Sequence, residues 1–164
     1  MVRLPHPELA GLVEAVKRHL VGRRVASIAG TEVPYSVFRS GEEAPDVAFY
    51  DEGGAIYVSE DLVDEDGRVA DLTVYHEHVE IRHKRAGRSH AYARRWAYVE
   101  ELLAAKDLFG GPGELRRYLR RRMGGYPEWK VPDPDAVAER LHGILSVEKP
   151  LRGELLRAIT EHRL

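Results

Sequence analysis

The sequence contains no cysteine, and it also contains no asparagine and no glutamine. Without thiols the chain can form no disulfide, no thiol nucleophile and no cysteine-ligated zinc site. Charged residues make up 32% of the chain. A composition with few thermolabile side chains and many charged ones is typical of heat-adapted proteins. In such proteins ion-pair networks gain importance as temperature rises. The composition therefore predicts a protein of a thermophile.

Long apolar runs are also missing from the sequence. No run approaches the roughly 20 apolar residues of a membrane span, and no basic start followed by an apolar stretch marks a signal peptide. We therefore expect a cytoplasmic protein with no membrane partner. The net charge is −2, so the whole chain is no obvious polyanion binder. A length of 164 residues is sufficient for one compact core with a helical addition.

The first part of the chain is predicted to contain one helix and a small sheet. Apolar residues recur at helical spacing after Pro7, and Gly22 ends the pattern. Gly53 and Gly54 separate two short runs rich in β-branched and aromatic residues, which is typical of a hairpin. Pro34 separates two earlier runs and predicts a turn or a sheet edge. The four predicted strands are residues 23–33, 35–39, 47–51 and 55–59.

Helical patterns dominate the rest of the chain. An acidic stretch, residues 60–67, is expected as a loop or one helical turn. Gly87 is suited to end the helix that follows, and Ser89 can cap the next one, so a helix hairpin is predicted. The first of the predicted helices begins between residues 67 and 71 and runs to residue 86, and the others are residues 90–106, 114–123, 135–147 and 151–162.

These patterns predict an α+β fold. It consists of an N-terminal helix, a small and mostly antiparallel sheet, a central helix hairpin that carries the polar site, and a helical C-terminal portion. We expect residues 1–109 to form the α+β core and residues 110–164 to form a helical extension packed on it.

Residues 72–97 hold four of the eight histidines of the chain, with two glutamates among them. At about 100° per residue, His76, Glu80 and His83 share one face of a helix. His76 and Glu80 are the pair that one ion reaches most easily, because His83 lies about 10 Å of helix rise from His76. Glu77 takes the place of a general base beside the ion. Imidazole and carboxylate are ligands of catalytic zinc, so the stretch predicts a metal site.

A hairpin with the strand AIYVS, an acidic loop and a helix with YHEHVE resembles the active-site half of small zincin-type metallopeptidases. In that family an edge strand lines the cleft, and a His-Glu-x-x-His helix supplies two zinc ligands and the base. The resemblance covers about residues 47–97 and implies a zinc-dependent peptidase, or a descendant of one, with a peptide or protein substrate. It makes His76 the first ligand and Glu77 the base. The second-ligand position holds Glu80, which gives a variant His-Glu-x-x-Glu motif.

Two questions stay open at this point. By reach, His83 and His90 are both candidates for a further ligand. Across the predicted helix hairpin, Arg94 faces Glu80, so a structural salt bridge between them is the alternative to a metal site. If the metal site exists, Arg94 or Tyr98 would stabilise an oxyanion.

The predicted helix over residues 114–123 supports a competing hypothesis, a non-catalytic module that binds nucleic acid or an acidic protein. Its basic residues could follow a phosphate backbone, and nearby aromatic rings could stack on bases. The residues concerned are Arg116, Arg117, Arg120, Arg121 and Arg122, with Tyr118, Tyr126 and Trp129. An exposed strand edge would equally allow peptide addition or a homodimer.

Overall fold

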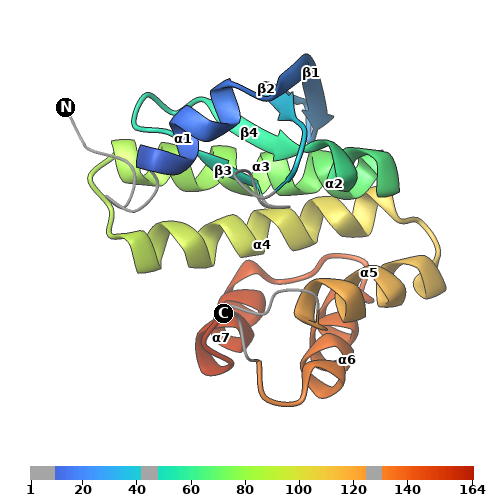
Figure 1. The fold of residues 1–164 in the computed structure, drawn as a ribbon. Helices are drawn as coiled ribbons and strands as arrows, with labels where there is room; N and C mark the ends of the chain where they lie inside the picture. Colours follow the sequence, from blue (N-terminus) through green and yellow to red (C-terminus); the bar gives the residue numbers. More distant parts are fainter. Residues whose placement is uncertain (1–9, 42–47, 125–130) are drawn as a thin grey trace. The chain divides into compact units, whose positions relative to one another are not determined.

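The structure is a computed structural model that describes residues 10–41, 48–124 and 131–164 (Figure 1). It confirms the predicted α+β class. The elements are α1 Ala10–Lys17, β1 Leu20–Ile28, β2 Thr31–Phe38, β3 Ala48–Tyr50, β4 Ile56–Ser59, α2 Glu60–Glu65, α3 Gly67–Arg85, α4 His90–Leu108, α5 Pro112–Gly124, α6 Pro134–Leu145 and α7 Arg152–Glu161. Each helix in these ranges is too short or too polar to span a bilayer.

The chain divides into two compact units, Met1–Ala97 and Tyr98–Leu164, and the division falls within α4. The first unit holds the sheet, α1 to α3 and the start of α4. The second unit holds the remainder of α4 with α5, α6 and α7. That residues 1–109 form the α+β core and residues 110–164 a helical extension packed on it stays a prediction.

The sheet has the strand order β1-β2-β4-β3. β1 and β2 form an antiparallel hairpin, β2 and β4 run parallel, and β4 and β3 are antiparallel. The turn of the first hairpin lies at Ala29 and Gly30, both with positive φ, and Pro34 lies inside β2 opposite Val25. β2 pairs with β4 from Ser36 onward. Pro34 is therefore at an edge of the ladder rather than at a turn, as suits a residue without an N–H.

The two faces of the sheet carry two apolar clusters. One face packs on α2 and α3 through residues such as Val58, Val63 and Val74. The opposite face packs on α1 through Phe38, Phe49, Tyr57 and Val16, and Figure 1 shows α1 and α3 on opposite sides of the sheet. Because side chains alternate along a strand, Phe49 faces α1 whereas its neighbour Tyr50 belongs to the cluster on the α3 side.

The α3–α4 hairpin is formed by the capping residues that the sequence predicts. Gly87 has φ 84°, its N–H donates to the Lys84 carbonyl at 2.9 Å, and the N–H of Arg88 donates to the His83 carbonyl at 3.0 Å. This pair of bonds is a Schellman motif, which ends α3. The Ser89 hydroxyl then accepts the N–H of Tyr92 at 3.2 Å and caps α4. The connection between the two helices is thereby fixed.

The second unit is built from four helical segments whose apolar faces are buried together. Buried residues from α4 to α7 include Leu102, Leu119, Leu141, Leu155 and Ile159. Asp133 caps α6 by accepting the Ala136 N–H at 3.2 Å, and Pro134 occupies the first helical position.

We predict that Gly54→Ala destabilises the fold more than Gly87→Ala. Both glycines have positive φ, so each substitution costs about 1 kcal/mol in backbone strain. At Gly54 the new methyl group would also overlap the guanidinium of Arg85, which donates to the Gly53 carbonyl at 2.7 Å. Displacing that bond costs roughly 1 kcal/mol more. Urea unfolding of the two variants measures the difference, and equal losses would contradict it.

Candidate functional site

Three predicted site residues come together on α3. One ligand atom from each of His76, Glu77 and Glu80 lies within 4.8 Å of the others. His76 and Glu80 are buried, with exposed fractions of 5% and 6%, and Glu77 is half-buried. The i, i+4 spacing brings the first and last of these onto one helix face. The cluster therefore combines a buried pair with a neighbouring carboxylate that solvent can reach.

Glu80 is the centre of this arrangement. Its Oε2 lies 3.4 Å from His76 Nε2. Its Oε1 accepts the hydroxyl of Tyr50 at 2.9 Å, and it lies 3.3 Å from His90 Nδ1 and 3.7 Å from Lys84 Nζ. These partners come from β3, α3 and the first residue of α4. A buried carboxylate needs such partners, because an unpaired charge in an apolar core is costly.

The electrostatics follow from these contacts. Burial alone would raise the pKa of Glu80, but the hydrogen bond and charge of His76, the Tyr50 hydroxyl and the charge of His90 outweigh it and lower the pKa to about 2. The pKa of Tyr50 is raised, first by burial and then by the charge of Glu80. Glu80 is therefore an anion at neutral pH, and Tyr50 is a neutral hydrogen-bond donor.

The two candidates for a further ligand take different positions. His83 packs edge-on against the ring of Tyr92, with 5.5 Å between ring centroids. His90 reaches Glu80, although the predicted pairing across the helix hairpin put Arg94 opposite Glu80. Arg94, which that pairing placed opposite Glu80, is half-buried and close enough to Tyr50 for its charge to lower the pKa of the phenol. The structure thus brings His90 into contact with Glu80, whereas the three mutually close ligand atoms belong to His76, Glu77 and Glu80.

Tyr98 belongs to the second unit, where its ring forms a cation–π contact with Arg122. The Arg122 guanidinium stands 4.9 Å from the centroid of the Tyr98 ring. Arg122 also donates to the buried carboxylate of Glu101, from Nε at 3.0 Å and 3.3 Å to its two oxygens and from Nη2 at 3.1 Å. The Tyr118 hydroxyl donates to the same carboxylate at 2.7 Å. The predicted oxyanion role of Tyr98 stays a prediction.

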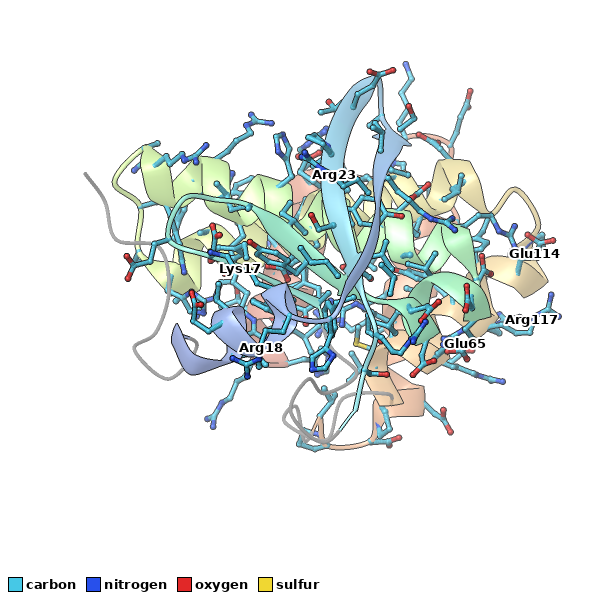
Figure 2. All side chains as sticks on the ribbon, turned by 45° about the horizontal axis from the view of Figure 1, so that its top comes forward. Lys17, Arg18, Arg23, Glu65, Glu114 and Arg117 are labelled. Atoms are coloured by element: carbon cyan, nitrogen blue, oxygen red, sulfur yellow. The ribbon has the colours of Figure 1, made fainter. Side chains whose placement is uncertain are left out.

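Three of the five arginines of α5, Arg116, Arg120 and Arg122, pair with acidic residues inside the second unit. Arg116 and Arg120 both pair with Glu139 on α6, at 2.8 Å and 3.3 Å. Arg117 is exposed, as Figure 2 shows, and so is Arg121. Tyr118 is buried, which removes one of the three rings considered for base stacking. The other two, Tyr126 and Trp129, lie outside the described residues. Nucleic-acid binding stays a prediction.

Sequence reasoning missed two members of the cluster, Tyr50 and Lys84. Lys84 follows Glu80 by four residues, and this helical spacing could have identified it. Tyr50 stands thirty positions before Glu80 on another element, and no local pattern connects the two. The Lys84 ammonium lies 5.2 Å from the centroid of the Tyr50 ring in a cation–π contact. Both side chains also contact Glu80.

No protein-family model, no curated protein and no solved structure matches the chain. The resemblance to zincin-type peptidases therefore depends on the motif in residues 47–97, and the function has to be argued from the contacts of this chain.

We predict that Glu80→Gln changes how stability depends on pH in the metal-free protein. The pKa of Glu80 is about 2 in the folded chain against a usual 4.5, so the unfolded state takes up a proton first as pH falls. The stability that Glu80 contributes is complete above its usual pKa and is lost as pH falls toward 2. The variant should be less stable at pH 7 by roughly 1–3 kcal/mol.

Urea unfolding between about pH 7 and pH 3 measures this effect. The stability gap between wild type and Glu80→Gln should narrow as the pH falls. Parallel stability curves would show that Glu80 does not have a lowered pKa.

Proposed function

We propose that the chain is a metal-dependent hydrolase of the peptidase type, with zinc held by His76, Glu80 and His90 and with Glu77 as the general base. One observation carries the proposal: two imidazoles from different helices contact opposite oxygens of one buried carboxylate, with a second carboxylate beside them. The helix matches the zincin motif at its first His and Glu, His76 and Glu77, and departs from it at i+4, where Glu80 stands in place of the second His.

The donor set suits a zinc ion. Zinc in proteins binds imidazole nitrogen and carboxylate oxygen at about 2.0–2.2 Å, so two tetrahedral ligand atoms lie about 3.4 Å apart. The contacts of Glu80 with His76 and His90 measure 3.4 Å and 3.3 Å. A charge-assisted hydrogen bond would be shorter, at about 2.7–2.9 Å. The spacing between His76 and Glu80 is therefore one that two ligands of a single ion can take.

His90 fits the third position better than His83 does. His90 is the first residue of α4, and the fixed connection from Gly87 brings it to Glu80. His83 is engaged with the Tyr92 ring. A site assembled from two helices has ligands on two sides of the ion, as a catalytic zinc with one open position needs.

A bound zinc ion would supply Lewis acidity, polarising a substrate carbonyl and making water more acidic. Glu77 would accept the proton of the attacking water and pass it to the leaving amine. Its carboxylate is near both His76 and Glu80, and its partial exposure lets water reach it. Arg94, a half-buried cation near the cluster, would stabilise the oxyanion. A cytoplasmic location, heat adaptation and a homodimer remain part of this proposal.

We predict that the purified chain binds one zinc ion and that His76→Ala abolishes this binding. Loss of a direct ligand should weaken the affinity by more than the roughly 10–100-fold that loss of an outer partner costs. Isothermal titration of the metal-stripped protein measures the affinity. A thermal shift gives a second readout, because zinc at 100 times Kd adds about 2.7 kcal/mol of stability.

His83→Ala is the matched control for this experiment, since it removes an imidazole from the same helix outside the cluster. It should bind zinc like the wild type. A wild-type chain that binds no zinc would refute the metal site. Equal loss of binding in the two variants would refute the ligand assignment.

We further predict that Glu77→Gln retains zinc and loses turnover on an unfolded protein substrate. Removal of a general base typically costs about 10²–10⁴-fold in rate. Glu52→Gln, an exposed glutamate in the β3–β4 turn, is the control and should leave the rate unchanged. Unchanged turnover in Glu77→Gln would exclude Glu77 as the base.

A further inference from the structure

The site has a polar neighbour on the sheet that the proposed chemistry does not use. Tyr50 is the last residue of β3, and its side chain is buried on the α3 side of the sheet. Its hydroxyl donates to Glu80 Oε1 at 2.9 Å. That distance is the shortest among the contacts described for this carboxylate, since His90, His76 and Lys84 lie at 3.3, 3.4 and 3.7 Å.

We propose that Tyr50 is the positioning residue of the metal site: its hydroxyl fixes the Glu80 carboxylate so that Oε2 faces His76 and Oε1 faces His90. This inference rests on the proposed zinc site and names the group that orients it. A glutamate side chain has three rotatable bonds, and ordering it costs free energy at the moment of binding. A hydroxyl that holds the carboxylate before the ion arrives removes that cost.

The geometry of Tyr50 suits this role. A phenol has one hydroxyl hydrogen to give, and Glu80 is an acceptor within its reach. The bond also leaves Oε1 with lone-pair capacity for a second partner, because a carboxylate oxygen accepts more than one. His90 and Tyr50 can therefore share Oε1 without competing for it.

The sheet gives the hydroxyl a rigid support. β3 is paired with β4 along its three residues, with Tyr50 opposite Ile56. Phe49 next to it stacks on Tyr57, at 5.3 Å between ring centroids, on the opposite face. The Lys84 ammonium lies 5.2 Å from the Tyr50 ring centroid and limits where the ring can move. Residues that orient a metal ligand in this way typically change the affinity for the metal when they are removed.

The test is the zinc affinity of Tyr50→Phe against that of Tyr57→Phe. Tyr57 is the matched control because it is also buried, lies on the adjacent strand and donates its hydroxyl to a carboxylate, that of Asp51 at 3.1 Å. Each variant loses one hydroxyl. We expect Tyr50→Phe to raise the Kd for zinc about 10–100-fold with one zinc per chain retained. Tyr57→Phe should leave the Kd unchanged.

A purely structural role for Tyr50 would reduce stability and leave the affinity of the folded protein unchanged. Cobalt(II) in place of zinc adds a second readout, since its visible bands respond to the number and geometry of its ligands. Without the Tyr50 hydroxyl, the Glu80 carboxylate can take other orientations at the ion, so the Tyr50→Phe spectrum should differ from the wild-type spectrum. The Tyr57→Phe spectrum should match the wild type.

The outcomes separate this inference from the zinc site itself. A wild-type chain that binds no zinc refutes the proposed function, and the inference with it. A wild-type chain that binds zinc, with equal Kd values and spectra in the two variants, overturns the role of Tyr50 alone. Weaker binding in Tyr50→Phe together with an altered cobalt spectrum supports it.

If Tyr50→Phe does not fold, the infrared difference spectrum of the wild type on zinc binding decides the question. Zinc draws charge from Glu80 and so weakens the bond from Tyr50, which should shift a tyrosine C–O band. If Tyr57→Phe shows the same shift, the band does not come from Tyr57. A difference spectrum without a tyrosine band overturns the inference.

Discussion

The buried carboxylate of Glu80 is the constraint on which the first unit depends. Glu80 faces the layer between the sheet and α3, where an anion without partners would be too costly to bury. Its partners are drawn from three elements, Tyr50 from β3, His76 and Lys84 from α3 itself, and His90 from α4. The same contacts that make burial tolerable therefore also tie the strand to the two helices.

The second unit also buries a carboxylate, but a different set of partners stabilises it. Glu101 is fully buried and is held by the guanidinium of Arg122 and the hydroxyl of Tyr118. A guanidinium stays protonated and cannot bind a cation, so the Arg122–Glu101 pair does not suit a metal ion. The imidazoles around Glu80 can lose their protons and offer nitrogen lone pairs instead. Of the two buried carboxylates among the described residues, the one in the first unit is thus the one that suits a metal ion.

The features that the sequence predicts are those with a local cause. Helix periodicity placed His76 and Glu80 on one face of α3, and Gly87 with Ser89 predicted where two helices end and begin. The features that it left open depend on distant partners. The choice of His90 over His83 depends on how α4 is rotated against α3, and the hydroxyl of Tyr50 arrives from a strand thirty positions upstream. The burial of Arg122 similarly depends on a carboxylate in another helix.

β3 has three residues, and two neighbours on it, Phe49 and Tyr50, pack on opposite faces of the sheet. Phe49 points to the α1 side and Tyr50 to the α3 side. A shift of the strand by one position would exchange these sides, because side chains alternate along the backbone. An apolar ring would then meet the carboxylate of Glu80, and a hydroxyl would be buried against α1. Such a short strand specifies its own register weakly. The hydrogen bond from Tyr50 to Glu80 on α3 therefore favours the observed register over the shifted one.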